Sequence, residues 1–433
     1  MPQMLIIADD LSGAADCAIA CSVSGLSAAV VFGDLHGKIS TDVLSIDADT
    51  RNLEPHLAAQ QTVALLRKYI GGYAPAKDLL LFKKVDSTLR GNVGAELAAM
   101  LELRRGISLS RQRIVAVMAP AFPAGGRTTV EGRQLVYGKP LHESETWQLH
   151  AAPCPTRIPT MVQLAGMRPA TLPLSLVRSH PDGLRQAMAQ LAVAADVLIC
   201  DAETDDDLRA IATASMVLGR ETIWSGSAGL AYHLPLAAGL SGTAYPASPL
   251  ASGPTLLVIG SPSSISRKQV DVLASSSLAT VLTLSTNALL AGAKSPEWSK
   301  HASALRATLQ DGHDIAVVLE ADDPIDTVKG RALTNALGVM MAPLAENIGA
   351  LVATGGETAR SVLQAWGVTG LRMIGELEPG VPFSMTENWN RRLPVLTKAG
   401  AFGNPQTLLH CWNFLHHLDR GAPVMYSELK GPL

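Results

Sequence analysis

The sequence lacks the features that mark several large classes of protein. Its five cysteines are an odd number and include no CxxC pair, which argues against a disulfide framework and against a zinc site. No apolar run is long enough to span a bilayer, and the first ten residues, MPQMLIIADD, have no basic region like that of a signal peptide. The formal net charge is only −3, with no basic stripe that could bind nucleic acid. We therefore expect a cytoplasmic protein without a membrane or nucleic-acid partner.

Several common catalytic and nucleotide-binding motifs are also missing. The chain contains no HExxH, no GxSxG and no Walker A pattern GxxxxGK[ST], and no two glycines are separated by a single residue. These absences exclude a zincin, a nucleophile-elbow hydrolase, a P-loop enzyme, a GxGxxG dinucleotide site and a protein-kinase glycine loop. Any phosphate-binding site in this chain must therefore be of another kind.

Apolar residues, by contrast, are plentiful. Hydrophobic residues make up 47% of the 433 residues and charged residues 17%, so the chain can bury more than one ordinary core. Short apolar runs alternate with longer stretches of helical period, which is typical of mostly parallel sheets flanked by helices. The predicted strands are MLIIA, AAVVF, DVLSID, LLLFKKV, RIVAVMA, DVLICDA and TIWSG in the first half, and TLLVIG, ATVLTL, DIAVVLEA, GALVATGG and LPVLTKAG in the second.

The two series of strands are separated by residues 239–254, GLSGTAYPASPLASGP, which have the composition of a linker. We expect two α/β domains, residues 1–240 and 255–433, joined by a linker at 241–254, with a cleft between them. Residues 121–160, rich in proline, glycine and arginine, interrupt the first series, and we expect a loop or hairpin excursion there.

Charged and hydroxyl side chains gather where predicted strands of the first domain end. Asp9 and Asp10 follow MLIIA, and they either cap the next helix or line an active-site edge; this stretch alone does not separate the two interpretations. The segment FKKVDSTLRGN then places cations, an acid and hydroxyls before a helix, which favours an anion site over a solvated loop. The further candidates on this edge are Arg51, Lys84, Asp86, Ser87, Arg90 and Arg127.

The second domain ends three of its strands in turns of a different kind. The turns are GSPSS (260–264), TGGET (354–358) and KAGAFGNP (398–405), and each combines glycine with serine, threonine or lysine. Glycine lets backbone N–H groups approach a phosphate closely, and hydroxyl groups add donors. One such turn is unremarkable, but three in one domain favour a nucleotide site.

These segments, in the order IADDLSGAAD, DTR, KKVDSTLRGN, APAFPAGGRTTVEGRQLVYG, GSPSSISRKQV, ATGGETARSVL and KAGAFG, resemble the four-carbon acid sugar kinases over essentially the whole chain. The resemblance implies an N-terminal domain that binds the acid sugar, a C-terminal domain that binds ATP, and formation of a tetronate 4-phosphate. KKVDSTLRGN looks more like the threonate and erythronate kinases than the 3-oxo-tetronate kinases, so D-threonate is the expected substrate. D-erythronate, L-threonate, a 3-oxo-tetronate or another acid stays open as the substrate.

The resemblance also assigns roles by position. Those that fall where the family holds the acid sugar are Asp9, Asp10, Arg51, Lys84, Asp86 and Ser87, and those that fall where it holds ATP are Ser261, Gly355, Gly356, Glu357, Thr358 and Gly400. Phosphoryl transfer also needs Mg²⁺ on the nucleotide phosphates and an acceptor for the hydroxyl proton. Asp10 and Asp86 are both candidates for this acceptor; no metal ligand is assigned.

Two further questions stay open at this point. A two-domain protein that clamps an acid sugar without chemistry is the alternative from another functional class, although it would leave the three glycine turns unexplained. A homo-oligomer is compatible with the sequence but is not indicated by any particular segment.

Overall fold

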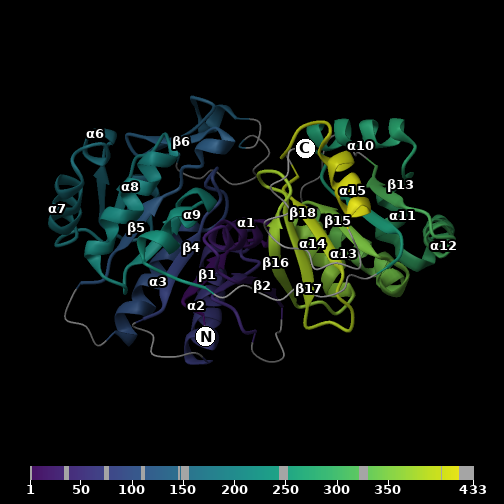
Figure 1. Ribbon diagram of the computed structural model, residues 1–433, viewed down its shortest axis with the longest axis horizontal. Coiled ribbons are helices and arrows are strands. Elements are labelled where there is room, and N and C mark those ends of the chain that lie inside the picture. The colour runs from purple at the N-terminus through teal and green to yellow at the C-terminus, as the bar shows by residue number, and fades with distance from the viewer. Residues whose placement is uncertain are drawn as a thin grey trace. The chain divides into compact units, whose positions relative to one another are not determined.

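The computed structural model divides the chain into two compact units (Figure 1). The first unit comprises residues 1–29 and 39–244, and the second comprises residues 30–38 and 245–433. Residues 30–38 thus belong with the C-terminal half, which a single boundary along the sequence does not anticipate. The structure describes residues 2–33, 39–72, 78–108, 113–144, 147, 156–242, 252–320, 330–400 and 402–418. Most of the expected linker, residues 243–251, lies outside the described residues.

The first unit is built on a parallel sheet with the strand order β3-β1-β4-β11-β5-β10-β9. Most of its strands are buried along their whole length, as expected where helices cover both faces of a sheet. Its strands are β1 (Met4–Ala8), β3 (Val43–Asp47), β4 (Leu80–Lys84), β5 (Ala116–Ala119), β9 (Pro169–Leu172), β10 (Val197–Cys200) and β11 (Ile223–Gly226). All were predicted except β9, a short strand at the end of the sheet whose residues are mostly half-buried.

Helices connect these strands and pack against them. The helices of the first unit are α1 (Leu11–Ser22), α2 (Pro55–Gly72), α3 (Val93–Ile107), α5 (Ile158–Leu164), α6 (Leu174–Val177), α7 (Pro181–Leu191), α8 (Asp205–Ser215) and α9 (Ala228–Ala237). Helix α1 packs on β1 and β3, and α2 packs on α3. Strand β2 (Ala28–Phe32), the predicted AAVVF strand, is divided between the units after Ala29.

A small antiparallel sheet lies in the segment where we expected an excursion. It consists of β6 (Arg127–Val130), β7 (Arg133–Val136) and β8 (Lys139–Pro140), which confirms a hairpin there. The β6–β7 turn is held by Asp201, whose carboxylate accepts from the backbone N–H groups of Glu131 at 2.7 Å and Gly132 at 2.9 Å. This sheet is therefore tied to the residue that follows β10.

The second unit has the strand order β13-β14-β12-β15-β18-β17-β16, parallel as far as β18 and antiparallel beyond it. The strands are β12 (Thr255–Ile259), β13 (Thr280–Leu284), β14 (Ile315–Leu319), β15 (Ala350–Thr354), β16 (Gly370–Glu376), β17 (Pro382–Glu387) and β18 (Pro394–Lys398). The hairpin β16–β17 was not predicted, because its buried Arg372, paired with Glu387 at 3.2 Å, interrupts the apolar pattern.

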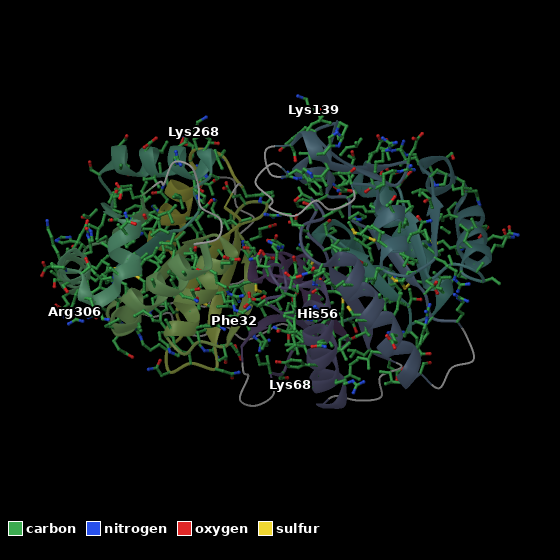
Figure 2. All side chains as sticks on the ribbon, turned by 180° about the vertical axis from the view of Figure 1, so that it is seen from behind. Phe32, His56, Lys68, Lys139, Lys268 and Arg306 are labelled. Atoms are coloured by element: carbon green, nitrogen blue, oxygen red, sulfur yellow. The ribbon has the colours of Figure 1, made fainter. Side chains whose placement is uncertain are left out.

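The helices of the second unit follow the same alternation. They are α10 (Ser264–Ser276), α11 (Thr286–Ala291), α12 (Pro296–Gln310), α13 (Gly330–Met341), α14 (Gly356–Ala365) and α15 (Thr407–His417). Short 3₁₀ helices in the two units span Pro123–Gly125, Leu141–Glu143, Met216–Leu218, Gly292–Lys294 and Ala342–Asn347. Lys139 of the small sheet and Lys268 of α10 are exposed and point outward from their own units (Figure 2). Within the described ranges, no helix is both long and apolar enough to cross a membrane.

Candidate active site

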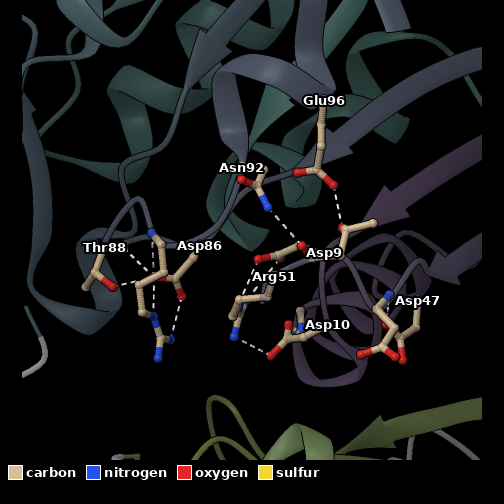
Figure 3. Close-up of polar contacts among 12 residues, drawn as sticks. Asp9, Asp10, Asp47, Arg51, Asp86, Thr88, Asn92 and Glu96 are labelled. Carbon is tan, nitrogen blue, oxygen red and sulfur yellow. Dashed lines mark hydrogen bonds and ion pairs between the residues drawn. The ribbon is translucent and has the colours of Figure 1, made fainter. Parts of the chain in front are cut away.

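Polar side chains of the first unit meet at the carboxyl ends of three neighbouring strands (Figure 3). Asp9 and Asp10 come directly after β1, Arg51 lies four residues after β3, and Lys84 is the last residue of β4. Because β3, β1 and β4 are adjacent and parallel, these ends share one edge of the sheet. The structure thus brings together residues that are up to 75 positions apart in the sequence.

The Arg51 guanidinium joins the two aspartates that follow β1. Its Nε donates to Asp9 Oδ2 at 2.7 Å, its Nη2 to Asp9 Oδ1 at 3.0 Å, and its Nη1 to Asp10 Oδ2 at 2.5 Å. Burial raises the pKa of Asp9, but the charge and hydrogen bonds of Arg51 outweigh it, so the pKa lies below its usual value. With both carboxylates ionised, this ion triad carries a formal charge of −1.

Asp10 has a second partner, because it is also the N-cap of α1. Its Oδ1 accepts from the backbone N–H of Gly13 at 2.8 Å. The capping interpretation is therefore confirmed; Asp10 also lies at the charged edge, and its part in an active site stays a prediction. The Asp10 side chain is 15% exposed, compared with 3% for Asp9, so of the two it is the more accessible to a ligand.

Asp86, after β4, is the hydrogen-bond centre of its loop. Its carboxylate accepts from Arg90 Nε and Nη2, both at 2.7 Å, from the Thr88 backbone N–H at 3.1 Å and from the Thr88 hydroxyl. Burial raises the pKa of Asp86, but Arg90 lowers it by more, and the net pKa is well below the usual value. A carboxylate with this many donors is a poor proton acceptor.

The two lysines that end β4 have different surroundings, since neighbouring strand residues face opposite sides of the sheet. Lys83 is fully buried and its Nζ lies 3.1 Å from Glu96 Oε2 of α3. Lys84 is 5% exposed and lies over the first turn of α1, where a Cβ atom added to Gly13 would come 2.8 Å from Lys84 Nζ. Lys83 therefore has a counter-ion within the fold.

The loop that carries Arg51 is held by residues that the sequence analysis did not assign. Asn92, the residue before α3, donates from Nδ2 to the carbonyls of Thr50 at 3.0 Å and Leu53 at 2.8 Å. Glu96 accepts from the Thr50 hydroxyl and is 1% exposed. A carboxylate on the packed face of α3, four residues after an asparagine, is the signal that could have indicated this support.

The structure leaves two predicted residues outside these contacts. Arg127 donates to the Gly125 carbonyl, and its guanidinium carbon lies 5.7 Å from the centre of the Tyr137 ring, so its described side-chain contacts are with residues near it in sequence. Ser87 accepts at its backbone carbonyl from Gln134 Nε2 of β7 at 2.8 Å. Through Gln134 the small sheet supports the Asp86 loop, which the sequence did not reveal.

In the second unit, the three glycine turns follow β12, β15 and β18, which are neighbours in the sheet. The Gly400 carbonyl accepts from the hydroxyls of Ser263 and Ser266, both at 2.8 Å, and Gly355 N donates to the Lys398 carbonyl at 2.8 Å. A Cβ atom added to Gly400 would lie 2.3 Å from Ser261 Oγ and 2.7 Å from Ser261 Cβ. The turns are therefore packed so closely that only glycine fits at position 400.

The middle turn leads directly into a helix. Gly355, with φ of 98°, is the N-cap of α14, Gly356 begins the helix, and Glu357 lies in its first turn. Thr358 is buried and its side chain lies against Gly260. Predicted nucleotide residues from all three turns are thus brought together around a helix N-terminus, which favours anions.

Two buried polar groups complete this region. The Thr354 hydroxyl is buried and has no hydrogen-bond partner among the described residues. Lys398 is 1% exposed, and its Nζ donates to the carbonyls of Ala399 at 3.2 Å and Gly400 at 3.3 Å. Burial lowers the pKa of Lys398 to about 8. In the described part of the chain, no three His, Cys, Asp or Glu side chains gather closely enough to cage a metal ion.

Two family models match the chain, one to each half. The model of a sugar-binding N-terminal domain matches residues 4–234, and that of a nucleotide-binding C-terminal domain matches residues 256–408. The D-threonate kinase of Cupriavidus necator is 38% identical to this chain, over 94% of this chain and 97% of its own length. The chain belongs to the four-carbon acid sugar kinase family.

Other members of the four-carbon acid sugar kinase family are more distant. The D-erythronate kinase of Heliobacterium modesticaldum is 25% identical over 96% of this chain and 97% of its own length. The 3-oxo-tetronate kinase of Burkholderia multivorans is 28% identical over 93% of this chain and 95% of its own length. A crystal structure of a Salmonella typhimurium LT2 protein, provisionally described as a tRNA synthase, shares the fold with a TM-score of 0.78 and 21% identity, over 95% of this chain and 99% of that one.

Proposed function

We propose that this protein is a kinase that transfers the γ-phosphoryl group of ATP to the 4-hydroxyl of D-threonate. The observation that carries the proposal is the charged cluster at the ends of β1, β3 and β4, which combines hydrogen-bond acceptors with a buried cation. D-Threonate presents one carboxylate and three hydroxyl groups, so it needs both kinds of partner. The D-threonate kinase from C. necator, at 38% identity, supports this substrate over the erythronate and 3-oxo-tetronate alternatives.

Within this proposal the first unit binds the acid sugar and the second binds the nucleotide, with residues 1–240 and 255–433 as the two domains. The matches of the sugar-binding and nucleotide-binding family models to residues 4–234 and 256–408 support this division. Carboxylate oxygens of Asp9 and Asp10 are suited to accept hydrogen bonds from the sugar hydroxyls. Such bonds would select the stereoisomer whose hydroxyl groups point toward the two carboxylates.

Asp10 is the proposed acceptor of the 4-hydroxyl proton. Its carboxylate has two described partners, Gly13 N and Arg51 Nη1, and its side chain is partly exposed. Asp86 accepts from Arg90 and Thr88 through several donors and has a strongly lowered pKa, so its role is to hold its loop. A general base must lie within hydrogen-bond reach of the proton that it removes, and each Asp10 oxygen, with a single described donor, keeps a lone pair for that proton.

ATP, when bound, supplies the phosphoryl group, and Mg²⁺ neutralises the phosphate charge. The glycine turns fit such a ligand, because the buried Thr354 hydroxyl lacks a hydrogen-bond partner among the described residues and Gly400 leaves room for no side chain. The proposed nucleotide residues are Ser261, Gly355, Gly356, Glu357, Thr358 and Gly400. Nucleotide-bound Mg²⁺ takes most of its ligands from phosphates and water, so the lack of a described metal cage is compatible with it.

The proposal is tested by an ATP-consumption screen of the purified protein. The panel contains D- and L-threonate, D- and L-erythronate and the 3-oxo-tetronates, and phosphorus NMR identifies the position of the new phosphate. We expect the highest kcat/KM with D-threonate and a 4-phosphate product. A higher kcat/KM with D-erythronate or a 3-oxo-tetronate would make that acid the proposed substrate in place of D-threonate. No ATP consumption with any of these acids would reject the kinase function.

A further inference from the structure

The candidate site offers two cations, Arg51 and Lys84, for the carboxylate of an acid sugar, and the structure distinguishes them. Arg51 already donates to both oxygens of Asp9 and to one oxygen of Asp10. A third carboxylate approaching Arg51 would meet a triad with a formal charge of −1. Like charges repel strongly where little water screens them, so this triad is a poor carboxylate site.

The other charges of the cluster are also balanced. Asp86 pairs with Arg90 at 2.7 Å, and Lys83 lies 3.1 Å from Glu96. Lys84 differs from them, because it has no hydrogen bond and no ion pair within 4.0 Å among the residues that the structure describes. It is 95% buried, and Asp10 and Asp9, which help to raise its pKa, do not pair with it directly, so its ammonium donors are left for a ligand.

Lys84 is also well placed for an anion. A Cβ atom on Gly13 would lie 2.8 Å from Lys84 Nζ and 3.3 Å from Lys84 Cγ, so the side chain rests on the first turn of α1. The N-terminus of a helix favours negative charge, and Lys84 adds a full positive charge there. Burial lowers the pKa of Lys84, but Cys17 and Asp10 are among the groups that raise it by more, so the pKa is above its usual value and the amine is cationic at neutral pH.

We propose that Lys84 binds the carboxylate of the acid sugar, whereas Arg51 is a positioning residue that holds Asp9 and Asp10 for the sugar hydroxyls. This inference rests on the proposed function, since it assigns parts of the same substrate. It also explains how the enzyme would distinguish an acid sugar from an uncharged sugar alcohol of the same length. Without a carboxylate, the buried charge of Lys84 would stay uncompensated in the complex.

The experiment compares D-threonate with D-threonamide, its uncharged amide, as phosphoryl acceptors at saturating Mg-ATP. The 4-hydroxyl is the same in both, so the ratio of their kcat/KM values reports how the carboxylate is recognised. We expect the wild type to prefer D-threonate by about 10- to 100-fold, as for a charge-assisted hydrogen bond. In Lys84→Met, which is one atom shorter and removes the charge, this preference falls below about 3-fold, because only the D-threonate value drops strongly.

Two comparison variants separate recognition from general damage. Arg51→Lys is expected to lower kcat/KM for both compounds by a similar factor, so the preference stays near the wild-type value. Arg127→Met removes the rival cation of the small sheet and is likewise expected to keep the preference. Thermal melting without ligand shows whether Lys84→Met is folded; Lys84→Gln serves if the Met variant does not fold.

The outcomes are distinguishable. A wild-type preference that persists in Lys84→Met or Lys84→Gln, or that disappears in Arg51→Lys or Arg127→Met, would overturn the assignment of Lys84 alone. If Lys84→Met raised the KM for Mg-ATP and left the preference for D-threonate unchanged, Lys84 would be assigned to nucleotide binding instead. Failure of the wild type to phosphorylate D-threonate would overturn the proposed function and this inference with it.

Discussion

The two units prepare their sites in opposite ways. In the first unit, ionised side chains at the ends of β1, β3 and β4 hold one another in ion pairs, and the backbone N–H groups of Gly13 and Thr88 add to these contacts. In the second unit, three glycine turns and the hydroxyls of Ser263 and Ser266 form the proposed nucleotide site, with Lys398 as its one buried cation among the described residues. Charged side chains thus dominate the first candidate site, and closely packed backbone dominates the second.

The difference suits the two ligands that we propose. A tetronate is small, and its stereoisomers differ only in the direction of hydroxyl groups, so fixed carboxylates are needed to distinguish them. Nucleotide phosphates are large and highly charged, and backbone N–H groups at helix N-termini bind them without ionised partners. We therefore expect substitutions in the first unit to act through charge and those in the second through shape.

The largest expected effect is that of Asp10→Asn. The change keeps the size of the side chain but removes the carboxylate that we propose as proton acceptor, so kcat should fall about 10²- to 10⁴-fold. Dissociation constants for Mg-ATP should stay close to those of the wild type, since Asp10 belongs to the first unit. Steady-state kinetics and calorimetry measure the two quantities separately.

Asp86→Asn is the matched control for this change. It breaks the ion pair with Arg90 at 2.7 Å, so we expect a higher KM for D-threonate and lower thermal stability, with a smaller loss of kcat. A larger kcat loss in Asp86→Asn than in Asp10→Asn would reverse the two roles. Because phosphoryl transfer has a loose transition state, near-normal kcat in both variants would assign Asp10 to positioning alone.

The next effect concerns shape in the second unit. Gly400→Ala would place a Cβ atom 2.7 Å from Ser261 Cβ, so one of the two turns must move. We expect KM for Mg-ATP to rise more than tenfold while the dissociation constant for D-threonate is unchanged. Steady-state kinetics measures the KM for Mg-ATP, and isothermal titration measures the dissociation constant for D-threonate.

Two controls accompany Gly400→Ala. The double variant Ser261→Gly with Gly400→Ala removes the clash and should restore part of the nucleotide affinity. Gly330→Ala, in the same unit, adds a Cβ atom with no described atom within 4 Å and should have little effect. Equal losses of nucleotide and D-threonate affinity in Gly400→Ala would mean that the substitution damages the whole protein.

A smaller effect is expected from Asn92→Ala, which removes two hydrogen bonds to the carbonyls of Thr50 and Leu53. Each bond is worth about 1 kcal/mol, so the turn that carries Arg51 should loosen and KM for D-threonate should rise about tenfold. Asn390→Ala, at an exposed asparagine of the second unit, is the control and should change nothing. An equal change in KM for Mg-ATP would contradict a role confined to the acid sugar.

The sequence indicated much of this arrangement, because strand ends and glycine turns are local signals. The parallel order of β3, β1 and β4 follows from alternating helices and strands, and it alone brings Asp9, Arg51 and Lys84 to one edge. What the sequence could not show is which charges pair. Arg51 looked like a free anion binder until the structure showed it joined to Asp9 and Asp10.

Support from distant segments was equally hidden. Gln134 reaches the Asp86 loop across 47 positions of sequence, and no local pattern records such a contact. The grouping of residues 30–38 with the second unit is another case, because it depends on tertiary contacts rather than on composition. Arg127 was predicted from its position after a strand alone; its described side-chain contacts are with Gly125 and Tyr137, and its role in the site stays a prediction.

The smallest expected effect is on the pH dependence of stability, and it compares the buried lysines of the two units, Lys84 and Lys398. Acidic groups around Lys84 raise its pKa, whereas burial lowers the pKa of Lys398 to about 8. In the unfolded chain a lysine titrates near 10.5, so between pH 8 and 10.5 the unfolded state binds more protons through Lys398 than the folded state does. The contribution of Lys398 to stability should therefore rise with pH across this window.

Lys398→Met isolates this contribution. Below pH 8 the wild type carries the cost of a buried charge, which the difference in pKa puts at roughly 3 kcal/mol at most. Denaturant unfolding at pH 7 and pH 10 should thus show the stability of the wild type rising relative to Lys398→Met. Lys84→Met should show no such relative rise between pH 7 and 9, because Lys84 stays protonated there. If the difference in unfolding free energy between the wild type and Lys398→Met were the same at pH 7 and pH 10, the pKa of Lys398 would be the same in the folded and unfolded states. The fold of the second unit would then not lower the pKa of Lys398.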